Sequence, residues 1–67
     1  MLPLYSRVCV TSSSFVDLGV LPGTIGYIIE RYADGAVEVE VSNPDDGTTL
    51  AQFVALEADL ELAEKAH

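Results

Sequence analysis

Histidine, cysteine and basic residues are nearly absent from this sequence, and tryptophan is missing altogether. The one histidine, His67, is the last residue, so a Ser-His-Asp or Cys-His catalytic arrangement is not expected. The one cysteine, Cys9, permits no internal disulfide and indicates a reducing compartment. These two residues alone cannot build a structural zinc site. We therefore expect a domain that is not an enzyme and that holds no metal and no cofactor.

Long apolar runs are missing as well, so no membrane-spanning segment is expected. The first residues, 1–5, lack the basic region and the long apolar core of a signal peptide, which predicts a cytoplasmic protein. The 67 residues are nevertheless 49% hydrophobic, enough for one folded domain. We expect a single domain over 1–67, with its core at about 4–62 and a C-terminal tail at 63–67.

Positive charge is scarce, because 3 Lys and Arg residues face 11 Asp and Glu residues and the net charge is −8. Such a chain repels phosphate backbones, so nucleic-acid binding is not expected. The same charge attracts a basic protein surface, and it also serves solubility. Both interpretations of the acidic surface stay open at this point.

Turn signals divide the chain into short segments of β-type composition. Pro22-Gly23 and Asp34-Gly35 are typical of tight turns, since proline presets one central position and glycine supplies a positive φ. The strands that these signals predict span residues 5–11, 24–32, 36–41, 48–54 and 60–62. The loop at 12–21 is expected to anchor in the core through its apolar side chains, Phe15, Val16 and Leu18.

Alternation is clearest at 36–41, where Val37, Val39 and Val41 share one face and the glutamates between them share the other. That pattern predicts a strand with one side in water. Gly26, within the preceding strand, indicates a bend or a close approach of another backbone.

The register of the hairpin between these two strands has two solutions. A two-residue turn would pair Arg31 with Glu38, a favourable cross-strand ion pair. A longer turn with a bulged glycine would place Tyr27 and Ile29 on the valine face and set Glu30 against Glu38. Burial of the apolar face favours the longer turn.

The C-terminal part also has two interpretations. Residues 56–59 resemble a single helical turn before a short closing strand, whereas the Ala, Leu and Glu content of 49–66 would suit one long helix. The leucines do not form a sustained helical stripe, which favours the strand. Five short strands and one helical turn predict an all-β fold, a small and partly open barrel that limits exposed edges.

Several segments together resemble a known bacterial family, and they are Leu4-Tyr5, Val8, Leu21-Pro22-Gly23-Thr24-Ile25-Gly26, Ile29, Glu38-Val39-Glu40-Val41, Gly47-Thr48 and Leu60. Over residues 4–62 the chain is similar to the small proteins grouped as domain of unknown function 4926. The resemblance implies an SH3-like barrel and an immunity or antitoxin-like inhibitor. It implies no catalytic residues.

The acidic surface is the candidate site. Six residues from the third strand, the turn after it and the flanking tyrosines are the expected partner-binding residues, namely Glu38, Glu40, Asp45, Asp46, Tyr27 and Tyr32. A second acidic group near the C-terminus contains Glu57, Asp59, Glu61 and Glu64.

These features predict a protein-interaction module that binds a basic partner protein, such as a toxin enzyme, and inhibits it. The alternative is a non-catalytic accessory or structural subunit of a larger enzyme complex. The sequence leaves the oligomeric state open, a homo-oligomer included.

Overall fold

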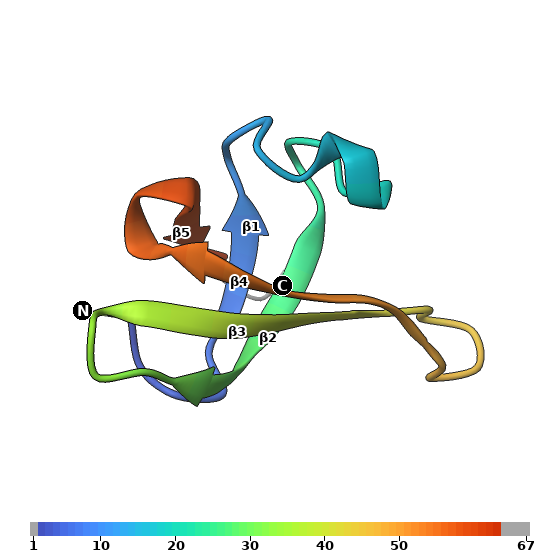
Figure 1. Ribbon diagram of the computed structural model, residues 1–67. Helices are drawn as coiled ribbons and strands as arrows, with labels where there is room; N and C mark the ends of the chain where they lie inside the picture. Colours follow the sequence, from blue (N-terminus) through green and yellow to red (C-terminus); the bar gives the residue numbers. More distant parts are fainter. Residues whose placement is uncertain (1, 64–67) are drawn as a thin grey trace.

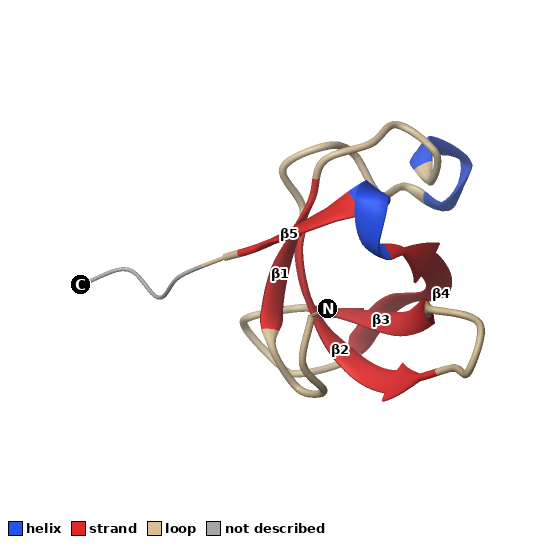
Figure 2. Ribbon diagram, turned by 90° about the vertical axis from the view of Figure 1, so that its left-hand side faces the viewer, coloured by secondary structure: helices blue, strands red, loops and turns tan. Residues whose placement is uncertain are grey.

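The computed structural model describes residues 2–63, which form one antiparallel sheet of 5 strands and two short 3-10 helices (Figure 1). In chain order the elements are β1 (Arg7–Val10), η1 (Val16–Leu18), β2 (Ile25–Arg31), β3 (Ala36–Ser42), β4 (Thr49–Leu56), η2 (Glu57–Asp59) and β5 (Leu60–Leu62). The strand order is β4-β3-β2-β1-β5. The sheet bends around one core as a small, partly open SH3-like barrel (Figure 2), which confirms the predicted fold class.

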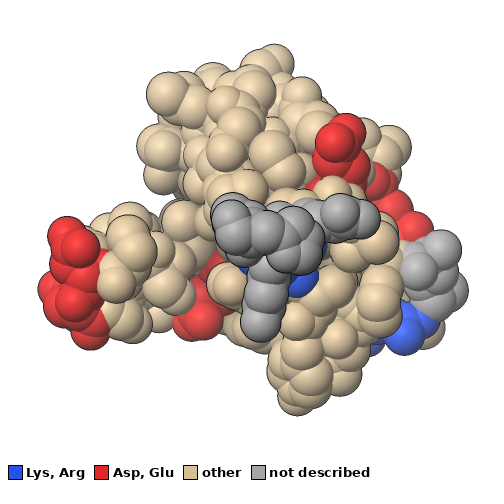
Figure 3. Space-filling view, turned by 180° about the vertical axis from the view of Figure 1, so that it is seen from behind, with Lys and Arg blue, Asp and Glu red and all other residues tan. Residues whose placement is uncertain are grey.

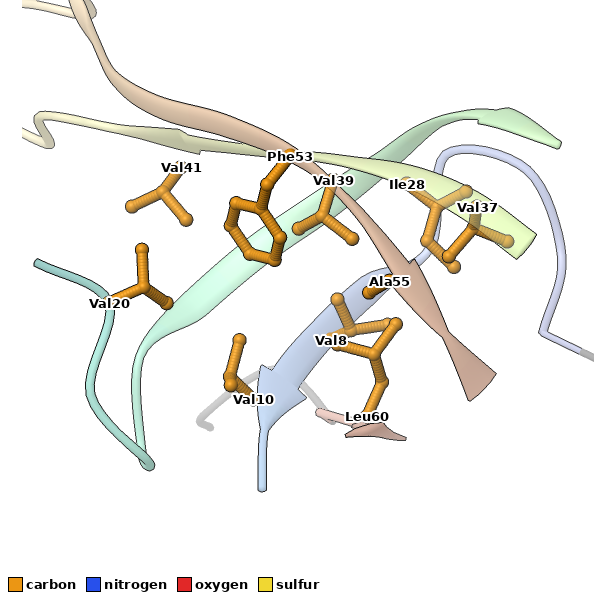
Figure 4. Packing of buried hydrophobic residues seen from close by; sticks show 10 residues of the cluster. All are labelled: Val8, Val10, Val20, Ile28, Val37, Val39, Val41, Phe53, Ala55 and Leu60. Atoms are coloured by element: carbon orange, nitrogen blue, oxygen red, sulfur yellow. The ribbon is translucent and has the colours of Figure 1, made fainter. Parts of the chain in front are cut away.

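The core is a single cluster of buried side chains from all the strands and from the loop before β2 (Figure 4). Its members are Val8, Val10, Val20, Ile28, Val37, Val39, Val41, Phe53, Ala55 and Leu60. Valine predominates because a β-branched side chain fits a pleated, half-buried surface. In β3 the buried valines alternate with the half-buried Glu38 and Glu40, which confirms the predicted strand with one wet face.

The turn between β2 and β3 is the longer, bulged one. The Tyr32 N–H donates to the carbonyl oxygen of Ala36 at 2.9 Å, and Gly35 has a φ of 90°. Glu30 therefore lies opposite Glu38, as this turn predicts. The register of the two-residue turn, with Arg31 opposite Glu38, is not the observed one, because Arg31 lies opposite Val37.

A second irregularity in β2 changes which side chains enter the core. The register shifts between Ile28 and Glu30, so Ile28 faces Val39 across the hairpin and is fully buried. The prediction that Tyr27 and Ile29 accompany the valines is wrong for this reason. Tyr27 lies on the outer face, and Ile29 is only partly buried at the bulge. An extra residue in one strand reverses the inside–outside alternation beyond it.

Gly26 lies where β2 passes closest to β3, which confirms the predicted close approach. A Cβ atom at this position would be 2.9 Å from the carbonyl oxygen of Glu40 and 2.9 Å from Cγ1 of Val39. It would also be 3.2 Å from Cγ2 of Val41. The hydrogen atom of glycine is therefore what allows the sheet to bend tightly here.

The loop before β2 anchors differently from the prediction. Phe15 packs against the core and its ring centroid lies 4.5 Å from that of Phe53. Val16 and Leu18 are 42% and 55% exposed, so their prediction as core anchors is wrong. Val20 is the buried residue instead. A 3-10 turn that ends at a left-handed Gly19 directs the chain inward only after η1.

The first strand is shorter than predicted, because Tyr5 has a positive φ of 66° and belongs to a turn in which the Ser6 N–H donates to Pro3. At the other end, η2 and β5 confirm the strand–turn–strand interpretation over a long helix. β5 pairs with β1 through Leu60 and Val10, so the first and the last strand of the chain lie side by side. The expected tail at 63–67 lies, apart from Ala63, outside the described residues.

Candidate functional site

The outer face of the sheet carries a row of polar and aromatic side chains across four strands. Arg7 of β1 lies opposite Tyr27 of β2, Tyr27 opposite Glu40 of β3, and Glu40 opposite Gln52 of β4. Side chains at paired positions share a face and lie close enough to interact. Glu40 therefore lies between Tyr27 and Gln52 on the outer face of the sheet.

Two hydroxyl groups hold the glutamates of β3. The Tyr32 hydroxyl donates to Oε1 of Glu38 at 2.7 Å, and the Thr49 hydroxyl donates to Oε2 of Glu40 at 2.9 Å. The bond to Glu38 raises the pKa of the Tyr32 phenol above 10.0, because ionised tyrosine could no longer donate and would face a carboxylate. These hydrogen bonds therefore orient both carboxylates.

The predicted aspartates lie further out along the hairpin arm that joins β3 to β4. Asp46 Oδ1 accepts hydrogen bonds from the Thr48 N–H at 3.0 Å and from its hydroxyl at 2.8 Å, and these lower the pKa of the Asp46 carboxyl below 3.8. The Asp45 N–H donates to the Asn43 side chain at 2.8 Å. Figure 3 shows the acidic tip of this arm separated from the other acidic groups by uncharged surface.

The six predicted residues therefore form two groups. Glu38, Glu40, Tyr27 and Tyr32 come together on the outer face of β2 and β3. The two aspartates lie at the tip of the arm, where the Asp46 carboxylate accepts hydrogen bonds from Thr48 and the Asp45 N–H donates to Asn43. The structure therefore does not bring all six residues into one patch (Figure 3).

The second acidic group, near the C-terminus, takes part in local structure. An Oε2 atom of Glu57 accepts from the Leu2 N–H at 2.9 Å, and an Oδ2 atom of Asp59 accepts from the Leu56 N–H at 3.1 Å. Glu61 is exposed on β5, and Glu64 lies outside the described residues. Glu57 and Asp59 therefore satisfy backbone N–H groups of the fold.

Sequence reasoning missed an apolar stripe on β4. Leu50, Val54 and Leu56 point away from the core and are 61%, 52% and 59% exposed. Val54 lies directly opposite Glu38, so the stripe adjoins the held glutamates. The sequence signal for this stripe is that β4 is apolar at both its odd and its even positions. Because successive side chains of a strand point to opposite faces, one of these two apolar sets must point away from the core.

The outer face is hollowed at the base of the arm. A shallow hollow of about 400 Å³ is lined by Arg7, Ile25, Tyr27, Ser42 and Pro44. Within residues 2–63 no group of three or more His, Cys, Asp and Glu side chains is arranged to hold a metal ion. The chemistry that this surface offers is carboxylate, hydroxyl and apolar contact.

Comparison with protein families gives one match. Residues 4–62 match the family described as Domain of unknown function (DUF4926). The chain belongs to this family. The match covers the whole barrel, from the turn before β1 to the end of β5, and it confirms the resemblance seen in the sequence.

For this DUF4926 domain, searches of curated proteins and of solved structures returned no match. Among the described residues, no helix has the length and apolar character needed to cross a membrane. The family description names no activity.

Proposed function

We propose that this DUF4926 domain is an acidic protein-interaction module that binds a basic partner protein. In its specific form the partner is a toxin enzyme, and the domain is an immunity or antitoxin-like inhibitor that covers a cationic cleft. Action in the cytoplasm fits the lone cysteine, which has no second cysteine in the chain to oxidise with.

The observation that carries this proposal is the separation of charge along the chain. Nine of the 11 acidic residues lie between positions 32 and 64, and no Lys or Arg lies among them. In the fold this segment becomes β3, the arm, β4, η2 and β5, whereas Arg7 and Arg31 lie on β1 and β2. The described acids of this segment lie mainly on β3, the arm, η2 and β5, and such an excess of negative charge speeds association with a basic surface.

The held carboxylates support an interface. Glu38 and Glu40 are half-buried and hydrogen-bonded to Tyr32 and Thr49, so little side-chain entropy is lost when a partner contacts them. Next to them lies the exposed apolar stripe of β4. Apolar groups with charged neighbours are what a specific, orientated complex requires.

The test uses the protein encoded by the adjacent gene, co-purified with the domain. Its affinity is measured at low and high salt for the wild type and for the double variant Glu38→Lys, Glu40→Lys. We expect binding to weaken by at least about 100-fold, because each central charge pair contributes on the order of 2 kcal/mol. Circular dichroism confirms that the variant remains folded.

A matched control carries the same change of charge elsewhere. Asp17→Lys with Glu61→Lys alters two exposed acids away from the glutamates of β3, and we expect less than about a tenfold effect on affinity. If the control weakens binding as much as the β3 variant does, charge acts without a localised site. An unchanged affinity of the folded β3 variant removes this face from the interface.

Partner activity separates the inhibitor from the accessory subunit. Loss of the partner's activity on binding supports inhibition, whereas retained or raised activity supports the accessory role. A gel-shift assay at low salt, where phosphate contacts are strongest, is expected to show no binding of duplex or single-stranded DNA.

A further inference from the structure

β4 is a border strand of the sheet, next to β3 and with no second strand beside it in the described part of the chain (Figure 2). It has 8 residues, twice the length of β1. A border strand presents unpaired N–H and C=O groups to any extended segment that approaches. The edge of β4 is thus a place where backbone hydrogen bonds remain to be made.

The register shows which strand each residue of β3 faces. Because the Tyr32 N–H donates to the carbonyl oxygen of Ala36, the backbone polar groups of Ala36 face β2. Successive residues in a strand direct these groups to opposite edges. Val37 and Val39 therefore direct theirs to β4.

The same alternation continues into β4. The partners of these valines, Ala55 and Phe53, direct their N–H and C=O groups toward β3. The residues between and beside them, Gln52 and Val54, direct theirs to the open edge. The N–H of Leu56 also points away from β3, and it donates to the carboxylate of Asp59, which ends the open edge there.

β4 has little of the usual protection of such an edge. Natural sheets guard border strands with lysine, proline, inward-pointing charge or a β-bulge. The sequence of β4, TLAQFVAL, contains no charged residue and no proline, and its one register irregularity lies at its start, opposite Val41 and Ser42. Instead its outer side chains form the apolar stripe, and acidic residues surround it, with Glu38 and Glu40 on one side and the Asp45-Asp46 tip at one end.

The negative charge around the open edge of β4 favours a basic segment over a second copy of this chain. A second copy of the chain would bring another net charge of −8 and a second pair of β3 glutamates to the same border, which is repulsive. In an extended segment of alternating apolar and Lys or Arg residues, all the cationic side chains lie on one face, so they can share the outer face with Glu38 and Glu40 while the apolar ones point to the inner face. Its cationic side chains extend over Gln52 toward Glu40, across a spacing of about 4.8 Å per strand.

We propose that the partner contributes a basic extended segment that adds to the open edge of β4 as a further strand. This inference rests on the proposed function, because it takes the partner to be basic, and it adds the mode of recognition. Main-chain hydrogen bonds to Gln52 and Val54 supply affinity, and the alternating side chains supply specificity.

The first test uses a synthetic peptide of alternating lysine and valine with the 8-residue length of β4. Amide hydrogen exchange of the ¹⁵N-labelled domain is measured by NMR with and without the peptide. We expect the amides of Gln52 and Val54 to exchange at least about tenfold more slowly, whereas Phe53 and Ala55 change little because β3 already binds them. Absence of peptide binding, or binding without this alternation, overturns strand addition.

Two matched peptides separate the strand from the charge. The first carries N-methyl groups on alternate residues and cannot pair along one edge, so we expect at least about tenfold weaker binding, or about 1.4 kcal/mol. The second replaces lysine by glutamate and is expected not to bind. If the N-methylated peptide binds as tightly as the unmethylated one, strand addition is overturned, whereas the proposal of a basic partner is unaffected. Equal binding and equal protection with the glutamate peptide overturn the basic partner and keep the strand.

A pair of variants tests the same edge from the domain. Gln52→Pro removes an N–H group that faces the open edge, a position where a border strand accepts proline. Gln52→Ala keeps that group and is the control. We expect Gln52→Pro to lose peptide binding and the alanine variant to retain it within about twofold. Equal affinities for two folded variants contradict the assignment of this edge, and the exchange pattern of the wild type decides the matter if the proline variant unfolds.

Discussion

Replacement of Gly26 tests the close approach of β2 to β3. In Gly26→Ala the new methyl group would lie 2.9 Å from the carbonyl oxygen of Glu40 and from Cγ1 of Val39. Neither neighbour can move away cheaply. The carbonyl belongs to the paired backbone of β3, and the Val39 side chain is fully buried.

The expected cost is the balance of three contributions. Overpacking a filled core costs about 1–3 kcal/mol and sometimes more. Burial of one extra carbon stabilises the folded state by about 0.8 kcal/mol, and the lower entropy of the unfolded chain stabilises it by about 0.4–1 kcal/mol. Because the contact includes rigid backbone, we expect the overpacking to exceed both gains. The predicted net loss is about 1 kcal/mol for alanine and about 2–3 kcal/mol for Gly26→Val, whose two further methyl groups enter the same filled space.

Chemical and thermal unfolding followed by circular dichroism measure these losses. For a domain of this size, 1 kcal/mol lowers Tm by about 4–8 °C. The control is Gly35→Asn, because nothing lies within 4 Å of that position and asparagine tolerates its positive φ. We expect a change of about 0.5 kcal/mol or less for the control. A free energy of unfolding for Gly26→Ala equal to or above that of the wild type would refute the close-approach argument.

Three further predictions concern packing and ionisation. Phe53→Ala is expected to cost about 3–5 kcal/mol and to leave so small a domain largely unfolded, as seen in the dispersion of its NMR spectrum. The pKa of Tyr32 is raised by Glu38, so its contribution to stability is present below 10.0 and is lost as the pH rises through the folded value; an ultraviolet titration of Glu38→Ala should show the pKa returning toward 10.0. The pKa of Asp46 is lowered, so its contribution is present above 3.8 and is lost as the pH falls through the folded value. Asp46→Asn should reduce this acid sensitivity, and an unchanged acid profile in the variant would contradict the role of its bonds to Thr48.

The sequence predicts those parts of the barrel that local patterns determine. The alternating valines predict β3 correctly, because only one face of this strand is apolar and that face must be buried. Pro22-Gly23 and Gly35 mark turns, and both glycines have positive φ. The acidic pair Glu38 and Glu40 shares a face for the same reason of alternation.

The sequence does not predict features that depend on pairing across the sheet. Ile28 and Ile29 are identical side chains in adjacent positions, and only the bulge in β2 determines that Ile28 is buried. In the same way, Val16 and Val20 differ in burial because η1 and Gly19 redirect the chain between them. The apolar stripe of β4 was missed because its outward residues are as hydrophobic as its inward ones.

The pairing of β1 with β5 has a consequence for the order of folding. β2, β3 and β4 form successive hairpins, whereas Val10 pairs with Leu60, about 50 residues later in the chain. Closing so long a loop costs about 2 kcal/mol more chain entropy than closing the arm between β3 and β4. We therefore expect the central meander to form first and the barrel to close last. During synthesis, β1 would have its closing partner only after residue 62 has left the ribosome, so a chain stalled earlier would expose that edge.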